Sequence, residues 1–150
     1  MSRIAELTSL LMLHLMLAPI GLPMLTAALL LTMTEAQQRL KLGLNILSTL
    51  LGLLVAVALL LWSHESGAPA TMGVYLPGNW PAPFGIVLVL DRLSAMMLLL
   101  TGFVALCSIV FAGARWHRAG VHYHTLFQFQ LMGLGGAFLT GDLFNLFVFF

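Results

Sequence analysis

One carboxylate, Asp142, lies in a stretch that is otherwise almost entirely apolar, residues 126–150 (LFQFQLMGLGGAFLTGDLFNLFVFF). An acid in a membrane-grade segment is costly, so it is found at an interface, in a protein-lined cavity or on an ion path. Thr140-Gly141-Asp142 favours a tight turn between two helices, since Gly suits a helix end and Asp an N-cap. Asp142 is therefore a candidate ion-pathway residue at the membrane face, and a cap contributing about 1 kcal/mol is the competing interpretation.

The histidines offer weaker chemistry. His14 lies about one turn inside the first apolar segment, where it is a second candidate for the ion pathway or, more simply, a helix contact. His117, His122 and His124 fall in the basic stretch 115–124, which we expect to be a solvated loop. No metal site and no cofactor is predicted, and the lone Cys107 is expected to pack as a small buried hydrophobe.

The composition is that of an integral membrane protein. Hydrophobic residues make up 61% of the 150 residues and charged ones 7%, with a mean hydropathy of +1.04. Soluble domains carry about 25% charged residues. The formal net charge of +1 and the lack of a basic run give no reason to expect nucleic acid as a partner.

The hydropathy pattern predicts an all-α membrane fold in one domain, residues 1–150. Four transmembrane helices are expected at about 9–33, 43–62, 92–114 and 124–140, and the start of a fifth at 142–150. Pro19 and Pro23 should bend the first helix. Residues 34–42, with Lys41, form a polar break, and turn residues between helices 2 and 3 predict a short external hairpin.

Small and polar residues suggest how these helices pack. Gly133, Gly135 and Gly136 indicate close helix contact, whereas Asn45, Ser48 and Thr49 could bond across helices. Asp91 before Arg92 is a plausible N-cap, so this pair and Gly141 are expected to have structural roles.

The distribution of Lys and Arg predicts the orientation. Arg39 and Lys41 lie in one polar stretch, Arg115 and Arg118 in another, and the long segment 63–90 between them has neither residue type. The positive-inside rule places the two basic stretches in the cytoplasm. The N-terminus, the hairpin and the Gly141-Asp142 turn then lie outside a bacterial inner (plasma) membrane that the chain crosses several times.

Two blocks carry a family resemblance: VYLPGNWPAPFGIVLVLDRLSAMMLLLTG at 74–102 and FQFQLMGLGGAFLTGDLFNLFVFF at 127–150. Here the sequence resembles the D-type subunits of the multisubunit monovalent cation/proton antiporters (Mrp or Pha complexes). More distantly it is similar to the antiporter-like membrane subunits of respiratory complex I and membrane-bound hydrogenases. The resemblance implies a transporter subunit with no enzymatic residues, working with other membrane subunits, the lipid bilayer, protons and Na⁺ or K⁺.

The resemblance also implies that more helices follow. In the family, the carboxylate central to proton movement comes directly after an FVFF-type run, and the mid-membrane lysines lie on later helices. This sequence reaches Phe150, and its only lysine is Lys41. We therefore expect the N-terminal part of such a subunit, inactive alone. The alternatives are a proton-translocating membrane subunit of a complex I-like NADH dehydrogenase or hydrogenase, and a truncated non-transporting fragment or assembly protein.

The predicted orientation can be tested with single cysteines in a Cys107→Ala background. A cysteine at Gly67 should react with an impermeant thiol reagent from outside the cell, and one at Gly120 only from the cytoplasmic side. The opposite labelling pattern would overturn the assignment.

Overall fold

The computed structural model describes residues 11, 14–65, 73–76, 85–115, 120 and 122–149. Within them lie five α-helices, a single 3₁₀ turn and two short strands. In chain order these are α2 (Ala18–Thr32), η1 (Glu35–Gln37), α3 (Gln38–Glu65), β1 (Gly73–Tyr75), β2 (Leu88–Leu90), α4 (Arg92–Arg115), α5 (Tyr123–Leu139) and α6 (Leu143–Phe149).

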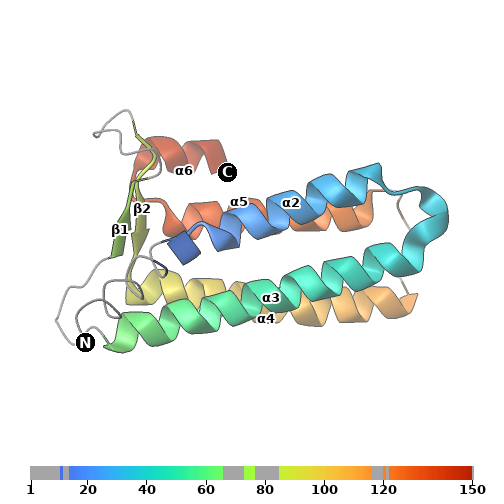
Figure 1. Ribbon diagram of the computed structural model, residues 1–150, viewed down its shortest axis with the longest axis horizontal. Coiled ribbons are helices and arrows are strands. Elements are labelled where there is room, and N and C mark those ends of the chain that lie inside the picture. The colour runs from blue at the N-terminus through green and yellow to red at the C-terminus, as the bar shows by residue number, and fades with distance from the viewer. Residues whose placement is uncertain are drawn as a thin grey trace.

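The four longer helices run side by side as two pairs (Figure 1). α2 packs along α5, α3 packs along α4, and further contacts join the two pairs into one bundle. At one end of the bundle α2 turns into α3, and α5 begins; the strands and α6 lie at the opposite end (Figure 1). The two ends therefore differ in character, and we call them the basic end, with Arg39 and Lys41, and the strand end.

The span predicted from residue 9 is interrupted by a turn. Residues 11, 14 and 15 are helical, the turn follows at residues 16–17, and α2 then starts at Ala18, whereas residues 9–10 lie outside the described part. Pro19 stands in the first turn of α2, where its missing N–H would have no helical partner in any case. The proline thus sets a helix start instead of bending a continuous helix, and Pro23 is the one inside α2.

The second helix is longer than predicted, and this corrects the placement of Lys41. α3 covers Gln38–Glu65 instead of 43–62. Lys41 was assigned to a polar loop, but it lies on α3 and is buried, with 4% of its surface exposed. Polar residues at the start of a long helix look like a loop by hydropathy, although nothing in their backbone preferences stops a helix there. The starts and ends of α4, α5 and α6 differ from the predicted ones by one residue at most.

The two strands pair with each other and with the turn before α6. β1 and β2 are antiparallel, with Val74 opposite Val89. Thr140 forms a bridge with Leu88, and the N–H of Gly141 donates to the carbonyl of Val87 over 2.8 Å. Residues 77–84 lie outside the described part, so the hairpin as a whole stays a prediction.

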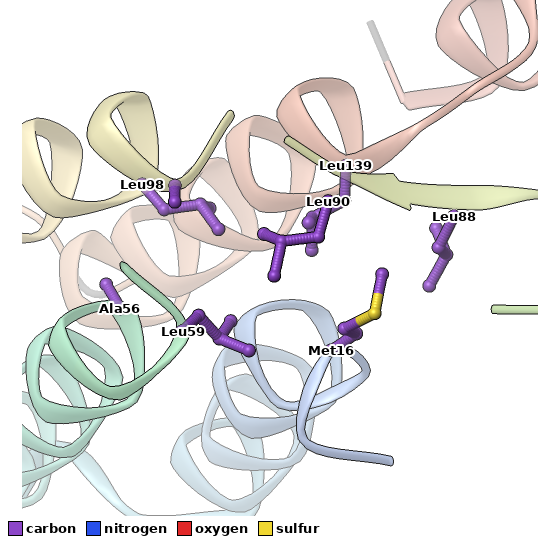
Figure 2. Packing of buried hydrophobic residues seen from close by; sticks show 8 residues of the cluster. Met16, Ala56, Leu59, Leu88, Leu90, Leu98 and Leu139 are labelled. Atoms are coloured by element: carbon purple, nitrogen blue, oxygen red, sulfur yellow. The ribbon is translucent and has the colours of Figure 1, made fainter. Parts of the chain in front are cut away.

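An apolar cluster at the strand end ties these elements to the helices (Figure 2). Leu88 and Leu90 of β2 belong to this cluster together with Leu59 of α3 and Leu139 of α5, and Leu90 lies beside Leu139 (Figure 2). The rest of the cluster consists of Met16, Ala56, Ala95 and Leu98. Burial of each leucine stabilises the fold by roughly 1.5–3 kcal/mol relative to exposure in water, so this cluster fixes β2 against α3 and α5.

Glycines on α5 allow two close approaches. A Cβ on Gly135 would lie 2.7 Å from the carbonyl oxygen of Pro19, so α2 and α5 touch backbone to backbone there. A Cβ on Gly136 would collide with the ring of Phe149, which places α6 against the last turns of α5. The sequence prediction of close packing at these glycines agrees with these contacts. Without a hydrophobic force between lipid-embedded helices, such contacts are a main source of association.

Among the residues that the structure describes, two helices are long and apolar enough to cross a membrane, Gln38–Ser63 and Arg92–Ala114. α2 is apolar but shorter, with 15 residues, and α5 has 17. Much of the bundle surface is apolar, with Phe111 and Leu126 among the most exposed side chains. Cys107 is also exposed on α4, so the prediction that it packs as a buried hydrophobe is wrong.

The Gly135 contact generates a stability prediction. Gly135→Ala should lower the thermal unfolding temperature in detergent, because its methyl group meets the Pro19 carbonyl; overpacking of this kind costs about 1–3 kcal/mol. Gly21→Ala on α2 is the matched control, since a Cβ there meets no atom within 4 Å and gains up to about 1 kcal/mol in helix propensity. Equal effects of the two substitutions would contradict the close approach.

Candidate functional site

A buried polar cluster joins α3 and α5 near the basic end of the bundle. The amide Nε2 of Gln128 donates to Oδ1 of Asn45 over 2.8 Å. Nδ2 of Asn45 lies 3.1 Å from Nδ1 of His124 and 3.3 Å from the His124 carbonyl oxygen. All three side chains are essentially inaccessible, at 0–1% exposed. The cluster therefore satisfies polar groups that would otherwise be stranded in an apolar interior.

Helical spacing brings these residues together. Lys41, Asn45 and Thr49 follow one another at intervals of four on α3, so they share one face of the helix. His124 and Gln128 have the same spacing on α5. Every one of these five side chains is buried. The two polar faces meet in the bundle instead of facing outward.

The hydrogen bonds assign a direction to the cluster. Because Oδ1 of Asn45 accepts from Gln128, the amide nitrogen of Asn45 is the group presented to His124. Nδ1 of His124 lies within hydrogen-bond distance of that nitrogen, at 3.1 Å. Thr49 adds a hydroxyl, which donates to the Asn45 carbonyl over 2.8 Å. The arrangement is a chain of donors and acceptors leading from His124 to Gln128.

The position of His124 corrects a sequence prediction. It was assigned to a solvated loop, but it lies in the first turn of α5 and is 1% exposed. His122, by contrast, is exposed, and His117 lies outside the described residues. A loop boundary drawn by composition alone missed the cluster; the shared four-residue spacing of polar residues on two predicted helices was the signal that could have found it. Asn45, Ser48 and Thr49 were predicted to bond across helices, and all three do so.

The two predicted ion-pathway residues lie at the strand end. Nδ1 of His14 is 3.1 Å from the hydroxyl of Tyr75, and the two rings meet edge to face. Asp142 is half-buried and precedes α6, where its Oδ1 accepts from the N–H of Phe144 over 3.4 Å. The Asp142 carboxylate therefore has a capping contact, and its role in an ion pathway stays a prediction.

Asp91, Arg92 and Gly141 have the positions expected of structural residues. Oδ1 of Asp91 accepts from the N–H of Ser94 over 2.6 Å, which caps α4 at Arg92. Hydrogen bonds from the Ser94 hydroxyl and N–H hold the pKa of the Asp91 carboxyl below its ordinary value. Gly141 packs so tightly against Val89 that a Cβ would overlap its side chain.

A metal centre is not evident in the part of the chain that the structure describes. No three residues among its His, Cys, Asp and Glu lie close enough to hold an ion. The chemistry that the cluster on α3 and α5 offers is hydrogen bonding.

The cluster predicts a cost for removing Asn45. Asn45→Ala leaves the buried amide nitrogen of Gln128 without its short acceptor, and we expect a loss of about 1–3 kcal/mol in unfolding free energy. Thermal unfolding in detergent measures it, with Gln130→Ala at an exposed position of α5 as the control. In the double variant with Gln128→Ala the cost should fall below the sum of the single ones. A loss no larger than that of the control would show that the amides do not stabilise the pair of helices.

Comparison with known proteins shows that the chain is similar to antiporter subunits. No protein-family model matches the chain. A probable K⁺/H⁺ antiporter subunit, of the D type, from Rhizobium meliloti is 53% identical over 138 residues, which cover 91% of this chain and 26% of that protein. The D-type subunit of the Na⁺/H⁺ antiporter of Alkalihalophilus pseudofirmus is 36% identical over 141 residues, covering 91% of this chain and 27% of that protein.

The fold has a counterpart in a solved complex. A chain of the Mrp complex from Dietzia sp. DQ12-45-1b superposes with a TM-score of 0.78 at 35% identity, covering 93% of this chain and 25% of that one. The chain thus spans about a quarter of the length of the proteins that it matches. Over that quarter, the chain belongs to the family of D-type subunits of the monovalent cation/proton antiporters.

Proposed function

We propose that the chain is the N-terminal part of a membrane subunit that exchanges Na⁺ or K⁺ for protons within a multisubunit antiporter. The observation that carries the proposal is the 53% identity with a K⁺/H⁺ antiporter subunit over 91% of the chain. A second relative is named for Na⁺, so the proposed substrate class is a monovalent cation. Both names concern antiporters, which favours this function over a subunit of a respiratory oxidoreductase.

In this proposal all four long helices cross the membrane. α3 and α4 have the length and apolarity to do so, and α2 and α5 pack alongside them. At 1.5 Å per residue, α2 and α5 measure about 22 and 25 Å, somewhat less than the roughly 30 Å of a bilayer core. Residues 14–15 are also helical and are separated from α2 by the turn at residues 16–17. They add to the span on that side.

The polar groups support an orientation with the basic end in the cytoplasm. Arg39 and Lys41 belong to the basic end, and Asp91 and Asp142 precede helices that start at the strand end. The positive-inside rule then places the N-terminus, the strands and Asp142 outside. In this orientation, Asp142 and His14 stand where cations or protons enter from outside, and the cluster around Asn45 lies toward the cytoplasmic face.

The proposal includes dependence on partners. In a proton path, ionisable groups hand protons to one another within the membrane. The described helices bury Lys41 and His124 near one face, while Asp142 lies at the other. We propose that the chain by itself does not exchange ions, and that other helices and subunits supply the groups between them.

Everted membrane vesicles carrying the complete complex test this function. After respiration acidifies them, addition of K⁺ or Na⁺ should reverse the quenching of a pH-sensitive dye, and vesicles from a strain lacking this subunit should not respond. Asp142→Asn separates the two roles of Asp142, since Asn caps a helix as well as Asp but carries no charge. A reduced exchange rate with an unchanged unfolding temperature would support the ion pathway.

Two results would contradict the proposal in different ways. Vesicles with the complete complex that do not respond to either cation would exclude cation/proton exchange. Full exchange by the Asp142→Asn variant would leave the function intact and reduce Asp142 to a helix cap.

A further inference from the structure

His124 is a titratable side chain buried inside the bundle. It is 1% exposed, although it lies in the first turn of α5. Among the residues that the structure describes, Lys41 is the one other ionisable side chain buried in this way. Ionisable groups inside membrane proteins usually bind ions or move protons, and histidine is the residue type whose charge changes near neutral pH. His124 is therefore the place to look for reversible proton binding.

The imidazole of His124 is coupled to the amide of Asn45. Nδ2 of Asn45 lies 3.1 Å from Nδ1 of His124, and Oδ1 of the same amide accepts from Nε2 of Gln128 over 2.8 Å. Nδ1 can accept a hydrogen bond from an amide N–H only while it carries no proton. A proton on Nδ1 would bring two N–H groups face to face. The described orientation of the Asn45 amide therefore suits only an unprotonated Nδ1.

Both amides can turn over while the rest of the cluster stays in place. The nitrogen and oxygen of an amide are similar in size, so the same positions also fit Asn45 and Gln128 with these atoms exchanged. In this reversed arrangement, the N–H at Nδ1 of His124 donates to Oδ1 of Asn45. Nδ2 of Asn45 then donates to Oε1 of Gln128. Both short contacts are kept, each with its direction inverted.

The two arrangements differ by two longer contacts. As described, Nδ2 of Asn45 also lies 3.3 Å from the carbonyl oxygen of His124, and Nε2 of Gln128 lies 3.4 Å from the backbone carbonyl oxygen of Asn45. Reversal places oxygen against oxygen at both points. Oε1 of Gln128 has no partner among the described residues, and reversal puts Nε2 in its place. An unprotonated Nδ1 thus favours the described arrangement, and a protonated one favours the reversed arrangement.

We propose that His124 is a proton-binding site at the basic end of the bundle, and that a proton on its Nδ1 reverses the amides of Asn45 and Gln128. After reversal Asn45 holds α5 through the imidazole only, because the hydrogen bond to the His124 carbonyl is lost. With the basic end in the cytoplasm, the site responds to cytoplasmic pH. This choice of side rests on the proposed function, whereas proton binding itself does not.

Other charged groups lie at the same end of the bundle. Lys41 shares one face of α3 with Asn45 and is buried, so a proton on His124 adds a second positive charge on the neighbouring helix. α2 has no charged residue between Ala18 and Thr32. The remaining titratable residues at this end are Glu35 of η1, Arg39 of α3, Arg115 of α4, and His122 and Tyr123 at the start of α5. A test of the site therefore compares variants that leave all of these groups in place.

Nitrogen NMR of the complete complex in lipid, with isotope-labelled histidine, tests proton binding. The chemical shift of each ring nitrogen reports whether it carries a proton, and the signals of His124 are those missing from the His124→Gln variant. We expect Nδ1 of His124 to gain a proton as the pH falls from about 8 to about 5. A ring whose Nδ1 stays unprotonated over this range, or is protonated throughout it, would overturn the proposal.

Gln128→Met tests the reversal without altering the imidazole or Asn45. Without the Gln128 amide, reversal loses one longer contact instead of two. His124 should then bind its proton more readily, and the midpoint of the transition should rise by about half a pH unit. Gln130→Met at an exposed position of α5 is the matched control and should leave the midpoint unchanged. A midpoint in Gln128→Met that equals the control, or lies below it, would overturn the reversal.

The unaltered complex provides a check that needs no substitution. With the side-chain amides labelled as well, a hydrogen on Nδ2 of Asn45 should contact Nδ1 of His124 at the higher pH and the Gln128 side chain at the lower pH. Contact with His124 at both values would overturn the reversal. None of these measurements involves ion exchange. A failure here therefore leaves the proposed function intact, and a complex that exchanges no ions would leave the proton site intact.

Discussion

The amide of Asn45 is the group on which the interior of this bundle depends. It joins α3 to the first two turns of α5 through one acceptor and one donor, and both partners are fully buried. In an aqueous protein each of these groups could turn to solvent. In hydrocarbon the alternative is an unsatisfied polar group, so the register of α5 against α3 is restricted to arrangements that pair the three side chains. Measured values for such bonds between membrane helices average about 0.6 kcal/mol, so their main effect is on specificity.

Close backbone contact, instead of hydrogen bonding between side chains, holds α2 against α5. The approach of Gly135 to the Pro19 carbonyl lets α2 lie directly on α5, and α6 returns along α5 because Gly136 leaves room for Phe149. These contacts need small residues and fixed positions, whereas the leucine-rich faces of α3 and α4 tolerate many partners. α5 therefore has two faces of different kinds, a polar one toward α3 and a glycine-rich one toward α2 and α6. This explains why α5 interrupts its apolar sequence with both Gln and Gly.

The sequence predicted elements whose signals are local, and it missed those that depend on packing. The turn at Gly141 and the caps at Asp91 and Asp142 follow from the backbone preferences of single residues, and they agree with the structure. Lys41 and His124 were assigned to loops because they stand next to charged residues. Their burial depends on which helix lies opposite, and spacing along one helix does not reveal this. The exposure of Cys107 was misjudged for the same reason, since an apolar helix has no polar face to show which side is outward.

The distribution of polarity in the folded chain reverses that of a soluble protein. Asn45, His124 and Gln128 are buried, while Phe111, Phe147 and Leu143 have 70–87% of their surface exposed. In water both features would be unfavourable. Burying a hydrogen-bonded polar group stabilises the fold only slightly there, and each large apolar side chain left exposed loses about 1.5–3 kcal/mol of stabilisation from burial. Against lipid or an apolar protein surface, an exposed apolar side chain is favourable instead of costly. In the same surroundings, a polar group without a hydrogen-bond partner costs more than it does in water. The same environment that makes the outer face of α4 stable is thus the reason that hydrogen-bonding groups gather between α3 and α5.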